Sequence, residues 1–170
     1  MTATLMQAIS VEHGQLLTSA QAIPQPAAGQ LLVKVAAAGV NRADLAQAAG
    51  TYPPPQGESE ILGLEVAGTI VALGEGVTGW RIGDEVLALV AGGGYAEYCL
   101  VEQTLCCLQP NTLSYAEAAS LPEAWMTAWF NLIDIGQLKA GQRVLIHAGA
   151  SGVGAAAIQL AKSLGAWVAV

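Results

Sequence analysis

A glycine-rich turn between an apolar strand and a helix constrains this chain more than any other stretch. The run 144–147 is typical of a parallel strand covered on both faces, and small residues follow it up to Gly154. A helix is predicted after the turn, ending before Gly165, and Trp167 begins a second strand. One face of that helix carries Val153, Ala157, Leu160, Ala161 and Leu164. The pattern predicts one βαβ unit.

Such a turn can hold a phosphate group. Backbone N–H groups at a helix N-terminus attract anions, and glycines let phosphate oxygens approach the main chain. Gly149 and Gly154 match the first and third glycines of the Rossmann pattern G-x-G-x-x-G, and Ser151 stands at the second. Any tight strand-to-helix connection could also use these glycines, but the flanking strands favour dinucleotide binding. The predicted cofactor-binding residues are Gly149, Ala150, Ser151, Gly152, Val153 and Gly154.

The composition favours a packed α/β interior and excludes several function classes. Hydrophobic residues make up 54% of the 170 positions and charged residues only 11%. With six Lys and Arg and a net charge of −7, no nucleic-acid partner is expected. No apolar run reaches the length of a membrane span, and no basic leader precedes an apolar segment. We therefore expect no membrane partner and a cytoplasmic location.

The cysteines and histidines do not suggest a metal site. Cys99, Cys106 and Cys107 lack C-x-x-C spacing, and their odd number argues against a disulfide framework. They are predicted to be buried or partly buried free thiols. His13 and His147 lie far apart in the sequence.

The first part of the chain reads as short strands punctuated by glycine and proline, which is typical of a barrel-like or sandwich β domain. The predicted strands cover residues 5–11, 15–20, 30–36, 61–73, 85–90 and 95–101. A short helix is predicted over residues 41–50, with Asn41 near its cap.

The pattern changes near residue 118. Ser114 and Glu117 form a predicted capping box that starts a new helix. Proline disfavours helix at the preceding residue, so we expect a break at Leu121 and a second helix from Pro122 to Ile135. The apolar stripe predicted to face the core of that helix contains Trp125, Ala128, Trp129 and Leu132.

Seven motifs in order then resemble one family. They are Gly39-Val-Asn-Arg-Ala-Asp44, Tyr52-Pro53, Gly63-Leu-Glu-Val-Ala-Gly68, Gly83-Asp-Glu-Val86, Gly93-Gly-Tyr-Ala-Glu97, Leu121-Pro-Glu-Ala-Trp-Met-Thr-Ala128 and His147-Ala-Gly-Ala-Ser-Gly-Val-Gly154. Over the whole chain they resemble the zinc-free quinone oxidoreductases of the medium-chain dehydrogenase/reductase superfamily. Within these zeta-crystallin-like proteins, the tumour-suppressor-inducible NADPH:quinone reductase branch is the most similar.

The resemblance implies a mixed α/β fold with an active site in the cleft between two domains. Residues 1–118 would form a GroES-like β-barrel catalytic domain lacking its C-terminal return. Residues 119–170 would contain the linking helices and the first βαβ unit of an incomplete Rossmann domain. A doubly wound domain has about six parallel strands, so we expect this chain to be a fragment that is inactive alone.

The resemblance also assigns site residues. Zinc-dependent relatives have a cysteine at the position of Asn41 and a histidine at that of Leu64, so metal-independent chemistry is implied. Tyr52 and Asn41 would donate hydrogen bonds to the acceptor, and Thr127 would lie near the nicotinamide of NADPH. Alternatively, Tyr52 only anchors a turn and Asn41 only caps a helix. Asp44 and Glu65 are predicted to fix loops by hydrogen bonds.

The implied activity is metal-independent hydride transfer from NADPH to a quinone. An enoyl or enone reductase of the same superfamily is an alternative, as is a short non-catalytic form that binds a full-length subunit. The full-length protein is expected to form a homodimer or homotetramer. The residues that distinguish NADPH from NADH follow the second strand, so the NADPH assignment rests on the resemblance alone.

Overall fold

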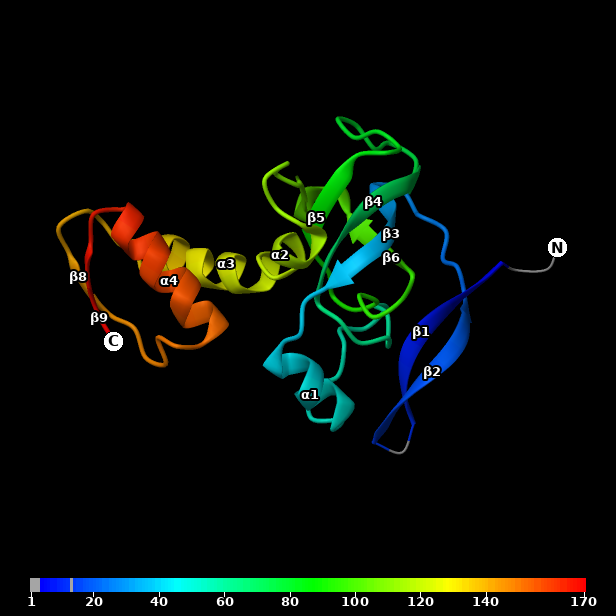
Figure 1. The fold of residues 1–170 in the computed structure, drawn as a ribbon, viewed down its shortest axis with the longest axis horizontal. Helices are drawn as coiled ribbons and strands as arrows, with labels where there is room; N and C mark the ends of the chain where they lie inside the picture. Colours follow the sequence, from blue (N-terminus) through cyan, green and yellow to red (C-terminus); the bar gives the residue numbers. More distant parts are fainter. Residues whose placement is uncertain (1–3, 13) are drawn as a thin grey trace. The chain divides into compact units, whose positions relative to one another are not determined.

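The computed structural model describes residues 4–12 and 14–170, so His13 lies outside the described part. Contacts divide the chain into two compact units, one ending at Leu121 and the other spanning Pro122–Val170. Figure 1 shows strands concentrated in the first unit and helices in the second. The predicted mixed α/β class is confirmed.

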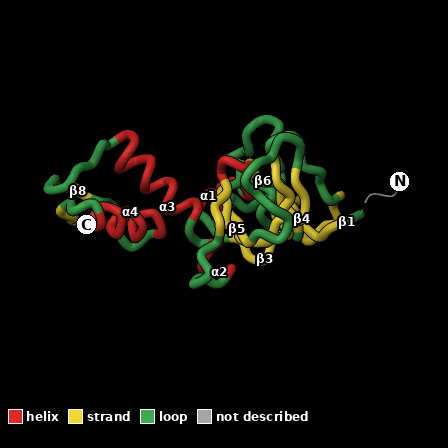
Figure 2. The backbone as a smooth tube through the Cα atoms, turned by 90° about the horizontal axis from the view of Figure 1, so that it is seen from above, coloured by secondary structure: helices red, strands yellow, loops and turns green. Residues whose placement is uncertain are grey.

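The first unit is built on antiparallel strands. β1 and β2 form a hairpin, and five further strands form a sheet in the order β6-β3-β4-β5-β7. Figure 2 shows these strands in yellow, joined by loops in green. The strands are β1 (Leu5–Glu12), β2 (Gln15–Ala22), β3 (Gln30–Ala38), β4 (Glu65–Leu73), β5 (Glu85–Leu89), β6 (Tyr98–Glu102) and β7 (Cys106–Leu108).

One apolar cluster holds this sheet together. Leu31, Val33, Val66, Ile70 and Val86 are fully buried in it. The β3–β4 register shifts at two places, between Leu32 and Val33 and between Val35 and Ala37. Such irregularities bend a strand and increase its twist, so the sheet curls around its core.

Three strand predictions for this unit needed correction. β6 begins at Tyr98 rather than at residue 95, because the residues before it make only an isolated bridge, between Ala8 and Ala96. β4 begins at Glu65 rather than at residue 61, because Gly63 has a φ of +99° that interrupts extended backbone. β7 was not predicted; it pairs Cys106 with Ala88 of β5. Cys106 is buried there, whereas Cys107 is exposed, contrary to the prediction for that thiol.

The helices are short. They are α1 (Arg42–Ala48), α2 (Tyr115–Ala119), α3 (Pro122–Trp129), α4 (Gly152–Ser163), the 3₁₀ turn η1 (Gln103–Leu105) and the π-helical segment η2 (Phe130–Ile135) that continues α3. The capping box of α2 is confirmed: Ser114 Oγ accepts from the Glu117 N–H, and Glu117 accepts from the Ser114 N–H at 2.8 Å. That backbone hydrogen bond lowers the pKa of Glu117. None of the described helices is long and apolar enough to cross a membrane.

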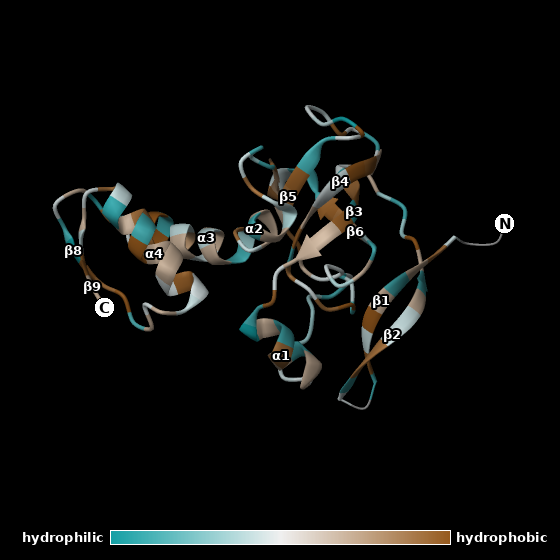
Figure 3. Cartoon of the chain, in the orientation of Figure 1, coloured by the Kyte–Doolittle hydropathy of each residue, from teal (hydrophilic) through white to brown (hydrophobic). Residues whose placement is uncertain are grey.

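The second unit contains the predicted βαβ arrangement. β8 (Arg143–Leu145) and β9 (Trp167–Ala169) pair in parallel, and α4 connects them. Val144 of β8 and Val168 of β9 pack against a buried apolar cluster that includes Ala157 and Leu160 of α4. Figure 3 shows apolar residues along α4 in this unit.

The sequence of β8 suits a strand covered on both faces, but within the described residues only one face is covered. Leu145 is 61% exposed and Trp167 of β9 is 73% exposed. Alternate strand residues point to opposite faces, and the helices described here cover only the face of Val144 and Val168.

The predicted apolar stripe of α3 is only partly buried. Ala128 is 1% exposed and Leu132 packs against the same cluster. In contrast, Trp125 and Trp129 are exposed by 36% and 50%. Val153, at the first turn of α4, is also exposed, because the apolar face of α4 meets the core only from Ala156 onward.

Candidate functional site

Asn41 lies at the entrance to α1, immediately after β3. Its backbone N–H donates to Asp44 Oδ2 at 2.7 Å, which satisfies a first-turn donor of the helix. Its side-chain Nδ2 donates to Glu65 Oε1 of β4 at 2.8 Å. The side chain is therefore tied to the sheet, and Asn41 is also the N-cap of α1, as the sequence predicts, where it forms a capping box with Asp44.

Asp44 and Glu65 are each only 3% exposed. Asp44 accepts from Asn41, from the Gly63 N–H at 3.2 Å and from the Tyr95 hydroxyl at 2.8 Å. Buried carboxylates need such partners, because an unpaired buried charge is costly. The predicted loop-fixing role of Asp44 and Glu65 agrees with these contacts.

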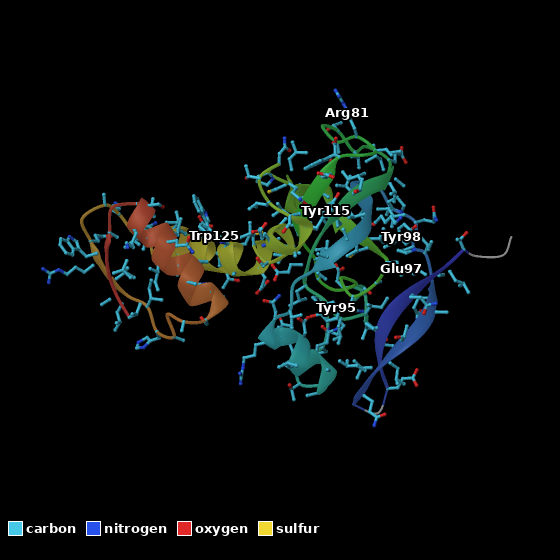
Figure 4. The ribbon with its side chains drawn as sticks, viewed as in Figure 1. Arg81, Tyr95, Glu97, Tyr98, Tyr115 and Trp125 are labelled. Carbon is cyan, nitrogen blue, oxygen red and sulfur yellow. The ribbon has the colours of Figure 1, made fainter. Side chains whose placement is uncertain are left out.

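Tyr95 completes this cluster, and its hydroxyl also lies 3.2 Å from the Gly39 carbonyl oxygen (Figure 4). Burial raises the pKa of Tyr95, and the hydrogen bond and negative charge of Asp44 raise it further. The phenol therefore stays protonated and donates.

Two glycines make room for these side chains. A Cβ on Gly39 would lie 2.6 Å from Glu65 Cγ. A Cβ on Gly63 would lie 2.7 Å from the ring of Tyr95. Glycine is therefore required at residues 39 and 63, because the side chains of Glu65 and Tyr95 approach their backbones closely.

Tyr52 lies beyond the other end of α1. The turn between them is closed by Thr51, whose N–H and hydroxyl both donate to the Ala46 carbonyl oxygen, at 2.9 and 3.0 Å. Tyr52 is 52% exposed, and no hydrogen bond to its hydroxyl is recorded within the described part of the chain. Asn41 and Tyr52 thus flank one helix, and the Tyr52 phenol is accessible to a ligand.

The glycine turn has a defined backbone in the second unit. Ser151 is the N-cap of α4, and its hydroxyl accepts from the Gly154 N–H at 3.0 Å. The Ser151 N–H donates to the Ala148 carbonyl oxygen at 2.9 Å, and Ala148 has a φ of +55°. Because first-turn N–H groups have no acceptor within a helix, those of Gly152 and Val153 remain for a ligand.

The glycines of this turn differ in what surrounds them. A Cβ on Gly154 would lie 2.7 Å from Gly149 Cα, and one on Gly149 would lie 2.7 Å from Val170 Cγ1. At Gly152 the nearest atom would be 4.0 Å away, the Cβ of Ala124. The protein therefore needs Gly149 and Gly154 for packing, whereas at Gly152 it leaves space beside the exposed N–H groups. Backbone N–H groups at a helix N-terminus are the kind of donors that bind phosphate groups, so the predicted pyrophosphate contact stays a prediction.

Thr127 lies on α3 in the same unit. Its hydroxyl is 3.3 Å from Glu123 Oε1, one turn earlier on the helix, to which it donates. The side chain is half-buried. The predicted contact with a nicotinamide remains a prediction.

The candidate site does not coincide with the cavity of about 350 Å³ in the first unit. That cavity is lined by the β1–β2 hairpin, the loop before β4 and the segment around Cys99, and neither Asn41 nor Tyr52 borders it. Within residues 4–12 and 14–170, no group of three or more His, Cys, Asp and Glu side chains could hold a metal ion.

Two features of the site were missed by the sequence analysis. No role was predicted for Tyr95 beyond its place in a motif. The glycines before it indicate a close approach of backbone and side chains. The pairing of Asn41 with Glu65 joins residues 24 apart, and no local pattern reveals it.

Comparison with known proteins places the chain in a family. The alcohol dehydrogenase GroES-like domain matches residues 27–129. The chain belongs to this family. Its fold and relatives are those of the medium-chain dehydrogenase/reductase superfamily of oxidoreductases, so the coarser part of the resemblance is confirmed.

A curated relative is a type I polyketide synthase of phenolphthiocerol synthesis from Mycobacterium bovis. It is 44% identical over 143 residues, which are 84% of this chain and 6% of the synthase.

Similar solved structures include enzymes of two kinds. The CurK enoyl reductase has a TM-score of 0.87 and 33% identity, over 96% of this chain and 53% of that one. The quinone oxidoreductase of Coxiella burnetii has a TM-score of 0.83 and 33% identity, over 97% and 56%. A mycobacterial protein solved with NADPH has a TM-score of 0.82 and 37% identity, over 97% and 52%. The chain therefore spans about half the length of these structures.

Proposed function

We propose that the protein is an NADPH-dependent oxidoreductase that transfers hydride, without a metal, to a quinone. The observation that carries the proposal is the Ser151-capped turn, in which Gly152 leaves two first-turn N–H groups open to a phosphate. NADPH would be held by Gly149–Gly154, with Thr127 toward the nicotinamide. When bound, this cofactor supplies the hydride.

The residues of the first unit would serve the acceptor. Reduction of a quinone builds negative charge on its oxygen, and hydrogen-bond donors stabilise such charge. The exposed Tyr52 phenol and the Asn41 amide are the proposed donors. Metal independence is proposed because Asn41 and Leu64 stand where zinc-dependent relatives have ligands, and neither side chain is a usual zinc ligand.

The second candidate function is reduction of an enoyl substrate. It is favoured by the 44% identity to a polyketide synthase and by the similarity to the CurK enoyl reductase. The same donors would then face the carbonyl oxygen of an α,β-unsaturated thioester. The two candidates share the hydride donor and differ in the acceptor.

A substrate panel separates them. Oxidation of NADPH by the protein at its natural length would be followed with small quinones, enones and enoyl thioesters. Turnover with quinones at a kcat/KM at least tenfold above that for enoyl thioesters is expected, and the reverse order would replace the first candidate by the second.

Substitution of Tyr52 by Phe tests its role as a donor. Because the side chain is 52% exposed and no hydrogen bond to its hydroxyl is given within the described residues, the change should leave folding intact. Loss of one donor to a developing oxyanion is expected to lower kcat by about 10²-fold. Unchanged quinone kinetics in Y52F would remove Tyr52 from this role.

A further inference from the structure

We infer that Glu65 is a positioning residue, which sets the orientation of the Asn41 amide for the reaction. The inference rests on the proposed function, because it concerns one of the two proposed donors. Its basis is the contact between Asn41 Nδ2 and Glu65 Oε1 at 2.8 Å, made by a carboxylate that is only 3% exposed.

The chemistry of the two groups allows one orientation. An Asn side chain has an accepting oxygen and a donating nitrogen at nearly equivalent places, so a half-turn about its last bond exchanges them. An ionised carboxylate can only accept. If Asn41 were turned over, two accepting oxygens would face each other in a buried place. Glu65 therefore keeps the NH₂ group of the Asn41 side chain toward β4. The second N–H of that NH₂ group does not bond to Glu65 and remains for another acceptor.

The surroundings hold both partners in place. The Asn41 backbone is fixed by Asp44 Oδ2 at 2.7 Å, and Asp44 is in turn held by the Tyr95 hydroxyl at 2.8 Å. The Glu65 backbone carbonyl accepts from the Gly39 N–H at 3.2 Å. Gly39 also leaves the space that the Glu65 side chain occupies, since a Cβ there would lie 2.6 Å from Glu65 Cγ.

This arrangement has a consequence for a ligand. A free Asn amide could present either its oxygen or its nitrogen to an acceptor, and half of its orientations would place an oxygen against developing negative charge. With Glu65 in place, only the donating arrangement is populated. Orientation of this kind contributes to kcat more than to KM, because the charge it meets develops in the transition state.

The test replaces Glu65 by Gln in the protein at its natural length. Gln has the same size but can either donate or accept, so it no longer selects one orientation of Asn41. E65Q is expected to lower kcat about tenfold with an unchanged KM for NADPH. Asn41→Ala should lower kcat at least as much, and the double variant should be no slower than N41A. The matched control is Glu102→Gln, which neutralises an exposed carboxylate and should leave kcat unchanged.

A second readout does not depend on activity. In ¹H–¹⁵N spectra of the wild-type protein, one side-chain amide proton of Asn41 should be shifted downfield and protected from exchange, and E65Q should lose both effects. An ordinary, rapidly exchanging Asn41 amide in the wild type would overturn the inference, even if Tyr52→Phe and N41A slow turnover. The Asn41 amide proton could instead be shifted while the N41A and Y52F variants both keep full activity. That result would overturn both the proposed function and the role of the Asn41–Glu65 hydrogen bond in catalysis. An additive loss in the double variant would also overturn the inference.

Discussion

At Asn41, the backbone and the side chain are held by two different buried carboxylates. Asp44 takes the N–H and Glu65 takes the amide, while Tyr95 donates to Asp44. Charge-assisted hydrogen bonds of this kind stabilise by roughly 1.5–3 kcal/mol each. These hydrogen bonds hold Asn41, Asp44 and Tyr95 in place, whereas Tyr52 remains exposed.

The three cysteines offer a separate test of the residue-scale structure. Burial raises the pKa of Cys99 to about 12 and that of Cys106 to about 12, so little of either thiol is ionised at neutral pH. Cys107 is exposed. One thiol per chain should therefore react rapidly with a thiol reagent at pH 8, and Cys107→Ser should abolish that fast phase. Equal rates for all three thiols would contradict the burial of Cys99 and Cys106.

At the scale of elements, α4 combines two requirements in its first turn. Gly154 must be glycine because the chain folds back against it, and Ser151 caps its N–H. Gly152 has open space beside it, although a side chain there would increase the helix propensity. The protein's own packing therefore does not explain glycine at residue 152, and under the proposed function the free space would admit a phosphate to the main chain.

Two alanine substitutions separate these requirements. Gly154→Ala should lower the free energy of unfolding by roughly 1–3 kcal/mol, because the new Cβ collides with backbone. Gly152→Ala should leave stability unchanged or slightly higher and weaken NADPH binding severalfold. Thermal unfolding and fluorescence titration with NADPH measure the two effects. Equal cofactor affinity in G152A and wild type would argue against the proposed pyrophosphate site.

How far the sequence predicts this structure depends on how local the determinants are. The capping box of Ser114 and Glu117 and the break at Pro122 were predictable, because they depend on neighbouring residues. Helical spacing identified an apolar stripe in α3, but it could not show that Trp125 and Trp129 lie outside the core. In the site, residue types at Asn41 and Tyr52 were recognised from motifs, whereas the Asn41–Glu65 pairing depends on how β4 passes the end of β3.

At the scale of the molecule, each unit supplies a different part of the proposed reaction. The first unit is a GroES-like sheet whose loops hold Asn41 and Tyr52, and the second is a βαβ unit whose turn is the proposed pyrophosphate site. Neither part alone specifies a reaction, since a glycine turn indicates only a dinucleotide and two hydrogen-bond donors indicate only an anion. Their combination in one chain of an oxidoreductase superfamily favours hydride transfer.

The most direct test of this account is the fate of the nicotinamide hydrogen. The protein at its natural length would be incubated with NADPH deuterated at C4, on either face of the ring, and with a small quinone or enone. An enone retains a transferred hydride on carbon, so deuterium from one face only should appear in its product by mass spectrometry, and quinone turnover should show a kinetic isotope effect for that same face. Absence of NADPH and NADH oxidation with every acceptor, by protein that is folded, would contradict the account.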